Sequence, residues 1–218
     1  QRGARVALAE CAELGGTCVN VGCVPKKLYS YAAGYAAAFE EAPGYGWTLP
    51  EAPRFDWATL KRQRAQEITR LNGVYQKLLD GAGVKTLTGW AQLVDGHTVS
   101  VSDTRYTARH ILVATGGMPA APDMPGRELA VVSDAMFDLP DFPKRLLVMG
   151  GGYIGCEFAS LFRGLGAHVT LVNRGAHILN GFDDDVREAL AREMGRQGID
   201  LRMTAQVETL RREGDGLV

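Results

Sequence analysis

The feature that most constrains the fold is an apolar strand that runs directly into a glycine-rich turn and a helix. The strand is Arg145–Met149 (RLLVM), and the turn carries Gly150, Gly152 and Gly155 in the pattern G-x-G-x-x-G. The pattern alone is weak, but here it stands between a strand and a helix, which is the context it requires. The first glycine permits the tight turn, the second lets the backbone approach a pyrophosphate, and the third lets the helix pack on the strand. The segment predicts a nucleotide-binding unit; a glycine turn without a ligand is the alternative.

The residues around this turn alternate between helix and strand. We expect helices over 153–165 and 183–197 and strands over 169–172 and 199–203. A βαβαβ run of this kind predicts an α/β fold with a parallel, doubly wound sheet. The first helix would offer its free N–H groups and positive dipole to phosphates.

The residue that follows the second strand predicts the choice of dinucleotide. An acid there would bind the ribose hydroxyls of NAD, whereas this chain has Asn173 followed by Arg174. A cation about twenty residues past the glycines suits the additional 2′-phosphate of NADP. A solvated loop charge is the alternative interpretation of Arg174.

A second glycine-rich stretch, GGTCVNVGCVPKK over residues 15–27, carries two cysteines. Cys18 and Cys23 can close a small disulfide ring, which is reducible where a partner stabilises the thiolate. The predicted helix after Cys23, together with Lys26 and Lys27, would lower a thiol pKa. This surrounding chemistry favours a reversible redox role. Zinc is disfavoured because C-x6-C-x4-C is not a usual zinc spacing, and we expect Cys11 and Cys156 to be small buried hydrophobes.

Composition excludes several classes of function. Lys and Arg number 24 against 25 Asp and Glu, so the net charge is −1 and no basic surface for nucleic acid or an anionic membrane is indicated. No apolar run approaches the roughly 20 residues of a membrane span. We expect a cytoplasmic protein.

The N-terminal half mixes the two types of element. A strand is expected over 5–10, a loop over 14–27, and helices over 28–41 and 56–80. Tyr31, Tyr35 and Phe39 share one face of the first helix, and the second carries an apolar stripe of Leu71, Val74, Tyr75 and Leu78. Short strands follow from 84 to 114, with turns at Gly89, Asp95-Gly96 and Asp103 and a last strand over 110–114. Further strands are expected over 207–210, before a turn over 213–216. Residues 118–125 read as a linker.

The segment LGGTCVNVGCVPKK resembles the redox signature of the flavin-dependent pyridine nucleotide–disulfide oxidoreductases. With RLNGVYQKLL, ILVATGGMPAAP and MGGGYIGCEFA, it is most similar to the glutathione reductase branch of that family. The resemblance covers essentially the whole chain and implies NADPH-dependent reduction of glutathione disulfide, with electrons passing through FAD and the cysteine pair. Lipoamide dehydrogenases and mercuric reductases usually carry serine where this chain has Lys26.

The resemblance implies a role for each residue of the redox centre. Cys23 would lie against the flavin, and Cys18 would attack glutathione disulfide. Lys26 would lie near flavin N5 and pair with Glu157, because each would otherwise be a costly buried charge. Tyr153 would cover the nicotinamide pocket, and Tyr75 would line the glutathione site. Core packing is the alternative for both tyrosines, and a first-turn helix acid is the alternative for Glu157.

The resemblance also implies two sets of cofactor contacts. FAD would be held by Glu10 at the end of the first strand and by Thr17, Cys18, Lys26, Ala91, Thr115 and Gly116. NADP would be held by Gly150, Gly151, Gly152, Ile154, Gly155, Glu157 and Arg174. One position departs from the family, because Asn180 stands where a second arginine usually meets the 2′-phosphate. NADP remains favoured over NAD, by a smaller margin.

These implications give a two-domain expectation: an FAD-binding domain over 1–118 with the redox disulfide, and an NADP-binding domain over 119–218. The family's first glycine fingerprint, its later FAD motif and its C-terminal interface domain, with a His–Glu acid/base pair, are not in this sequence. We therefore expect an internal fragment of a homodimeric enzyme. A reductase of another small disulfide (trypanothione-, glutathione-amide- or mycothiol-like) and a non-catalytic nucleotide-binding module remain alternatives.

Overall fold

The computed structural model describes residues 3–214 and 216–218. By their contacts they form two compact units, and each is described by itself. Unit 1 holds the residues up to 24 together with 63–118, and unit 2 holds 25–62 and 119–218. Within the described residues, no helix is both long enough and apolar enough to span a bilayer.

Unit 1 contains two small sheets. Strand β1 (Ala7–Glu10) pairs in parallel with β2 (Lys85–Thr88), and Glu10 lies opposite Thr88. Strands β3 (Ala91–Leu93), β4 (Thr98–Val101) and β5 (Thr104–Thr107) form an antiparallel sheet. The turns fall where glycine and aspartate predicted them, and Gly89 adopts a φ of 142° that disfavours any side chain.

The long helix α3 (Trp57–Gly81) begins in unit 2 and continues through unit 1. Asp56 caps its start, because the carboxylate accepts the Ala58 N–H at 3.0 Å. Hydrogen bonds from Thr59 lower the pKa of that carboxyl. The helix ends at Gly81, as the sequence predicted.

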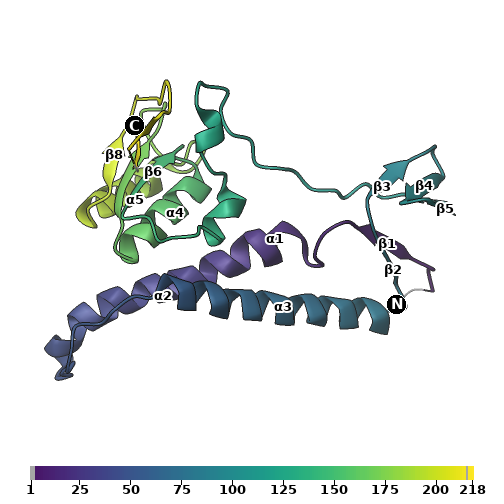
Figure 1. Ribbon diagram of the computed structural model, residues 1–218, viewed down its shortest axis with the longest axis horizontal. Helices are drawn as coiled ribbons and strands as arrows, with labels where there is room; N and C mark the ends of the chain where they lie inside the picture. The colour runs from purple at the N-terminus through teal and green to yellow at the C-terminus, as the bar shows by residue number, and fades with distance from the viewer. Residues whose placement is uncertain (1–2, 215) are drawn as a thin grey trace. The chain divides into compact units, whose positions relative to one another are not determined.

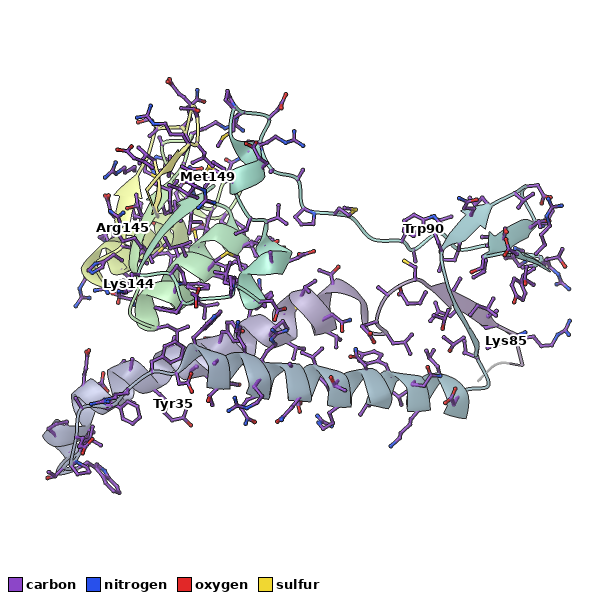
Figure 2. All side chains as sticks on the ribbon, viewed as in Figure 1. Tyr35, Lys85, Trp90, Lys144, Arg145 and Met149 are labelled. Atoms are coloured by element: carbon purple, nitrogen blue, oxygen red, sulfur yellow. A yellow bond between two sulfur atoms is a disulfide. The ribbon has the colours of Figure 1, made fainter. Side chains whose placement is uncertain are left out.

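Unit 2 is built around the predicted parallel sheet, with strand order β6-β7-β8. Figure 1 labels two of its strands, β6 and β8. Its strands are Arg145–Met149, His168–Val172 and Asp200–Arg202. Helix α4 (Tyr153–Gly164) packs against β6 and β7, and α5 (Asp184–Arg196) packs against β8. Figure 2 marks the two ends of β6 by Arg145 and Met149; the glycine turn begins at the Met149 end. The α/β class and parallel βαβαβ pattern are confirmed.

Aromatic side chains form the core of unit 2 beside α4. Tyr29, from helix α2 (Cys23–Glu41), is fully buried and donates its hydroxyl to the Phe137 carbonyl at 2.8 Å. The Trp57 ring lies 5.4 Å from that of Tyr29 and 5.8 Å from that of Phe162. Helix α2 approaches α4 closely at Gly164, where an added Cβ would meet the Ala33 Cβ at 2.9 Å.

Short elements complete the two units. Three 3₁₀ turns lie in unit 2, at Ala42–Tyr45, Arg127–Leu129 and Ser133–Phe137. A terminal hairpin pairs β9 (Arg212–Glu213) with β10 (Gly216–Leu217). The predicted turn between them includes Asp215, which lies outside the described residues.

The expected loop over 14–27 is wrong, because most of it is helical. Helix α1 (Gly16–Val21) precedes α2, which starts at Cys23. Gly15 and Gly16 have positive φ angles that lead the chain into α1. Gly22 separates the helices, and a Cβ there would lie 2.8 Å from the Thr17 carbonyl oxygen. These glycines therefore punctuate helices and do not form an open loop.

Three other expectations are also corrected. Residues 110–114 form no strand, and Leu112 is 89% exposed, because no strand among the described residues pairs with this apolar run. Residues 207–210 form none either; the Leu210 N–H bonds the Pro125 carbonyl in place of a ladder partner. Cys11 is exposed, whereas Cys156 is buried as expected.

The two apolar stripes of the long helices face away from the core. Tyr31 and Tyr35 are exposed on α2, and Figure 2 labels Tyr35 on that helix. Val74, Tyr75 and Leu78 are likewise exposed on α3. Helical spacing predicted the shared faces, but Tyr29 supplies the buried contact of α2.

Candidate functional site

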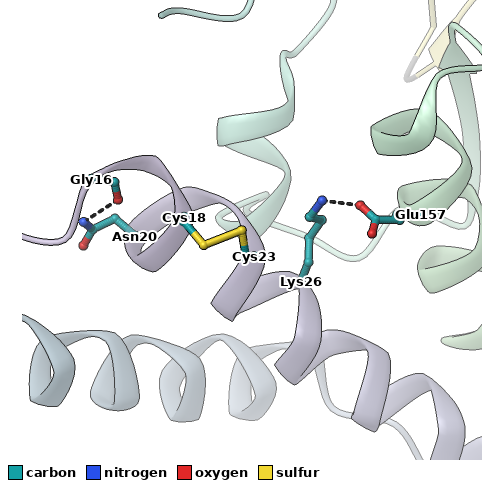
Figure 3. Close-up of a disulfide and its surroundings, with 6 residues drawn as sticks. All are labelled: Gly16, Cys18, Asn20, Cys23, Lys26 and Glu157. Atoms are coloured by element: carbon teal, nitrogen blue, oxygen red, sulfur yellow. Dashed lines mark hydrogen bonds and ion pairs between the residues drawn. A yellow bond between two sulfur atoms is a disulfide. The ribbon is translucent and has the colours of Figure 1, made fainter. Parts of the chain in front are cut away.

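The two cysteines of the glycine-rich stretch form a disulfide in unit 1 (Figure 3). Cys18 belongs to α1 and Cys23 is the first residue of α2, with Cα atoms 4.6 Å apart. Both residues are exposed, so a small disulfide or a thiol can reach the bond. The structure confirms that this pair closes the predicted ring.

Two asparagines that sequence reasoning missed hold helix α1 in place. The Asn20 amide donates to the Gly16 carbonyl at 2.9 Å (Figure 3) and to the Leu14 carbonyl at 3.3 Å. The Asn72 amide, from α3, donates to Asn20 Oδ1 at 2.8 Å and to the Leu14 carbonyl at 2.7 Å. The available signal was a polar residue directly after Leu71, the first residue of the apolar stripe of α3. These bonds fix the segment that carries Cys18.

In unit 2 the structure brings three predicted residues together. The Lys26 ammonium, from α2, forms an ion pair with the Glu157 carboxylate of α4 (Figure 3). The same ammonium lies 5.4 Å from the centre of the Tyr153 ring, within cation–π range. Tyr153 and Glu157 are four residues apart on α4 and therefore share a face.

Burial of the ion pair is unequal. The side chain of Lys26 is 15% exposed, whereas that of Glu157 is 50% exposed. The lysine thus has little water to replace its partner, and removing Glu157 would leave a largely buried charge. Lys26 follows Cys23 by three residues along the sequence of α2.

The glycine turn between β6 and α4 has the geometry of a phosphate cradle. A Cβ at Gly155 would lie 2.1 Å from the Gly150 carbonyl oxygen, so only glycine allows this close packing. A Cβ at Gly152 would meet nothing within 4 Å, so this exposed position is open to a ligand. No side chain caps α4 at Gly152, which leaves its first N–H groups for an anion.

A small hollow of about 160 Å³ lies beside this turn. Its lining includes Gly151, Gly152, Tyr153, Asn173, His177, Leu179, Asn180 and Phe182. Arg174 is exposed, stands two residues after the end of β7, and has no ion-pair partner in the part of the chain that the structure describes. Another hollow in unit 2, about 620 Å³, is lined by other residues, such as Tyr35 and Phe55.

The residues of unit 1 that were expected near FAD lie mostly at exposed positions. Glu10 ends β1, its carboxylate accepts the Ala12 N–H at 3.0 Å, and its carbonyl accepts the Gly89 N–H at 2.9 Å. This second bond places the end of β1 near Ala91, the first residue of β3. Three further residues of this set are exposed: Thr17, Thr115 and Gly116.

The remaining thiols differ in reactivity. Burial raises the pKa of the Cys156 thiol to about 11, and its S–H lies 3.6 Å from the Gly151 carbonyl. This cysteine is therefore protonated and serves packing. Cys11 is free and exposed.

Comparison with known proteins identifies the family. A sequence profile described as "Pyridine nucleotide-disulphide oxidoreductase" matches residues 1–218. The chain belongs to this family. Solved structures similar to this oxidoreductase chain include the HOCl-induced flavoprotein disulfide reductase RclA from Escherichia coli, with 26% identity and a TM-score of 0.84, and its Cu(II) complex, with the same values. Both matches cover 99% of this chain and 47% of the other.

Curated relatives of the oxidoreductase chain carry a narrower name. It is 46% identical over 215 residues to a glutathione reductase from Burkholderia cepacia and 42% identical to one from Nostoc sp.. It is 43% identical over 203 residues to the chloroplastic/mitochondrial glutathione reductase of Pisum sativum. The chain spans about half the length of the first two relatives, 48% and 47%, and 37% of the third.

Proposed function

We propose that the protein carrying this chain reduces glutathione disulfide with NADPH, and that electrons pass through FAD and the Cys18–Cys23 disulfide. The observation that carries the proposal is the exposed disulfide, closed between α1 and the first turn of α2 in a chain that the family profile matches throughout. The glutathione reductases at 42–46% identity support glutathione disulfide as the substrate.

The residues of unit 2 fit a pyridine dinucleotide. The open position at Gly152 and the uncapped start of α4 suit the pyrophosphate, and Arg174 suits a 2′-phosphate. Ile154 and Tyr153 are exposed in the first turn of α4, beside the same N–H groups. Asn180 lines the hollow and offers an amide, not a second cation.

The residues of unit 1 fit part of a flavin site. Glu10 follows a parallel strand and keeps one carboxylate oxygen without a hydrogen bond among the described residues, as a ribose-binding acid requires. Gly116 has a φ of 70° and open space at its Cβ position, so its backbone can approach a ligand. Thr17 and Thr115 supply exposed hydroxyls. Bound FAD would supply the passage of two electrons from NADPH to the disulfide.

The chain's own cysteines account for the exchange with substrate. Two electrons cleave the Cys18–Cys23 bond and leave two sulfurs as thiolate or thiol. The Cys18 thiolate attacks one sulfur of glutathione disulfide, forms a mixed disulfide and releases one glutathione thiolate. The Cys23 thiolate then attacks Cys18, restores the intramolecular bond and releases the second glutathione. Each thiolate released takes up one proton, so each cycle consumes two protons and two electrons.

Three residues on or beside α4 are proposed to act where NADPH would deliver its electrons. The positive charge of Lys26 stabilises negative charge on groups near it, and Glu157 holds the ammonium in place through the ion pair. Tyr153 is 57% exposed beside the start of α4, so its ring can cover the nicotinamide position and move aside. Tyr75 is exposed on α3 of unit 1 and is proposed to line the glutathione site.

The domain division at residue 118 is also proposed, with FAD binding over 1–118 and NADP binding over 119–218. One break between the contact units falls at this position, although residues 25–62 group with the later part. The homodimer and the cytoplasmic location remain predictions. Other small disulfides and a non-catalytic nucleotide-binding role remain the competing functions.

A disulfide panel tests the proposal directly. The full-length protein, loaded with FAD, should oxidise NADPH with glutathione disulfide at a higher kcat/KM than with trypanothione, glutathione-amide or mycothiol disulfides. Turnover confined to another member of the panel would replace the substrate, and bound nucleotide without turnover of any disulfide would favour the non-catalytic alternative.

A further inference from the structure

The side chain of Asn173 is the least expected polar group beside the glycine turn. It follows β7 directly, 22 residues after Gly151, where a ribose-binding acid would stand in an NAD site. Its amide does not face outward to a ribose. The Asn173 oxygen accepts the Gly151 N–H at 3.1 Å.

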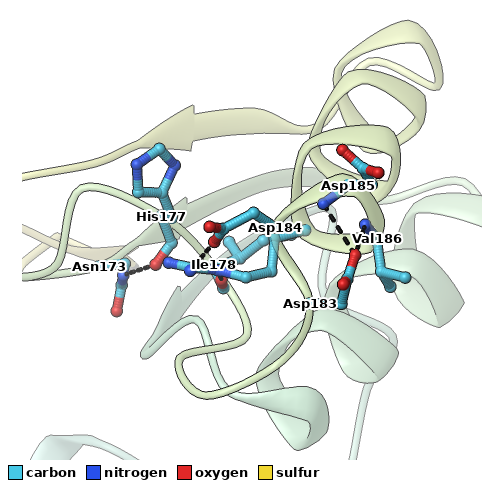
Figure 4. Close-up of polar contacts among 8 residues, drawn as sticks. Asn173, His177, Ile178, Asp183, Asp184, Asp185 and Val186 are labelled. Carbon is cyan, nitrogen blue, oxygen red and sulfur yellow. Dashed lines mark hydrogen bonds and ion pairs between the residues drawn. The ribbon is translucent and has the colours of Figure 1, made fainter.

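The amide nitrogen of Asn173 is committed to the other side of the hollow. It donates to the His177 carbonyl at 2.8 Å, as Figure 4 shows, and to the Gly175 carbonyl at 3.2 Å. A carboxamide has two N–H donors, and both are therefore used. The reverse orientation of the amide would place its oxygen against two carbonyl oxygens, so the network fixes the orientation.

The segment that Asn173 grips, residues 173–180, is held at several further points. The Thr204 N–H bonds the Gly175 carbonyl at 3.1 Å, and Arg187 Nε bonds the Ile178 carbonyl at 3.0 Å. Leu179 is in the left-handed region with a φ of 52°, and its N–H bonds the Gly151 carbonyl at 2.6 Å. We call residues 173–180 the cation loop, because Arg174 is part of it.

Gly151 is thus bonded on both of its backbone polar groups by this cation loop. Its N–H donates to the Asn173 oxygen, so this donor does not remain for a phosphate, and its carbonyl accepts the Leu179 N–H. The space is also filled, because a Cβ at Gly151 would lie 2.9 Å from Asn173 Cγ. Gly151 acts as the joint between the glycine turn and the cation loop.

We propose that Asn173 is a positioning residue that clasps the glycine turn to the cation loop and thereby fixes Arg174 for the 2′-phosphate of a pyridine dinucleotide. The inference rests on the proposed use of NADPH and deepens it. Asn173 reaches the 2′-phosphate only through the loop. Because Asn180 leaves the site one cation short, Arg174 carries more of the 2′-phosphate recognition, and its placement matters more.

Equilibrium binding to the full-length protein separates this role from a general structural one. The probes are adenosine 2′,5′-bisphosphate and AMP, which differ by the 2′-phosphate alone. In Asn173→Leu, which keeps the branching at Cγ and removes all three amide bonds, the bisphosphate should bind about tenfold more weakly, the size of one charge-assisted hydrogen bond. AMP should lose about threefold or less, because Leu179 still holds Gly151.

Arg174→Gln supplies the coupling control. If Asn173 acts by placing Arg174, adding Asn173→Leu to Arg174→Gln should weaken binding of the bisphosphate by no more than Asn173→Leu weakens binding of AMP. Equal losses for bisphosphate and AMP, or additive losses in the double variant, would overturn the positioning role. Failure of the unaltered protein to bind either probe would overturn the nucleotide site itself and the proposed NADPH chemistry. Circular dichroism of each variant establishes that it is folded.

Discussion

Gly155→Ala tests whether the glycine turn is packed as tightly as the structure shows. The new Cβ would lie 2.1 Å from the Gly150 carbonyl oxygen and 3.2 Å from its carbon. The obstacle is backbone, so the turn must retreat by at least about 1.3 Å to reach an ordinary van der Waals distance. Overpacking of this kind costs about 1–3 kcal/mol, against a gain of up to about 1 kcal/mol in helix propensity.

Gly195→Ala is the matched control for this substitution. Gly195 lies in α5 of the same unit, and a Cβ there meets nothing within 4 Å. This variant should raise the free energy of unfolding by about 0.5–1 kcal/mol through helix propensity. The two alanine variants should thus differ in sign.

Urea unfolding and nucleotide binding measure the two consequences together. Gly155→Ala should lower the urea midpoint of unfolding and weaken the binding of adenosine 2′,5′-bisphosphate. Gly195→Ala should leave that binding unchanged. The displaced backbone is the turn expected to meet the pyrophosphate, so stability and affinity should fall together. The reasoning is refuted if Gly155→Ala matches Gly195→Ala in both stability and affinity.

Three further predictions concern the cysteines and their supports. Cys18→Ser or Cys23→Ser should abolish disulfide turnover while the protein keeps its flavin absorbance, and retained turnover would refute their roles. Asn72→Leu should lower the free energy of unfolding by about 1–3 kcal/mol, because the Leu14 carbonyl and Asn20 lose a hydrogen-bond partner. The midpoint potential of the Cys18–Cys23 disulfide should shift in the same variant. An unchanged potential in a destabilised protein would show that Asn72 contributes to stability alone. Because burial raises the folded pKa of Cys156 to about 11, above its ordinary 9.0, the unfolded state loses this proton first, so the free energy of unfolding should fall as pH rises from 9 toward 11. Urea titrations should find a shallower fall in Cys156→Ala, and identical slopes would contradict a buried thiol.

Sequence alone predicted the elements whose pattern and termini are local. The parallel strands around β7 and the helices α4 and α5 lie within a few residues of their expected bounds, because apolar runs and glycine stops define them. Asp56 and Asp183 also mark helix starts by side-chain bonds to the next residues.

Elements that depend on distant partners were predicted less well. The run at 110–114 has strand composition but no pairing strand among the described residues, and the exposed stripes of α2 and α3 have helical spacing without burial. Helix α1 was not predicted, because its glycines indicated a loop. Side-chain hydrogen bonds of Asn20 and Asn72 stabilise this helix. The spacing of residues in the sequence cannot reveal a hydrogen bond between side chains that are 52 positions apart, such as Asn20 and Asn72.

The parts of the candidate site that lie within one short motif were predicted from the sequence pattern, and the contacts between distant residues were not. The disulfide and the glycine turn each lie in one short motif, and the structure confirms that both are formed. The ion pair of Lys26 with Glu157 joins residues 131 apart, and only the family resemblance suggested it. The amide of Asn173 was passed over because its role lies in three hydrogen bonds that no motif records.

Electrons from NADPH should reach one disulfide, Cys18–Cys23, and this delivery can be measured directly. The measurement is differential alkylation of the FAD-loaded, full-length protein with and without NADPH, followed by mass mapping of the peptide that carries Cys18 and Cys23. We predict that Cys18 and Cys23 are alkylated only after NADPH is added, whereas the free Cys11 is alkylated in both samples, and that glutathione disulfide reverses the gain at Cys18 and Cys23. NADPH oxidation that leaves these two cysteines bonded to each other would contradict the account.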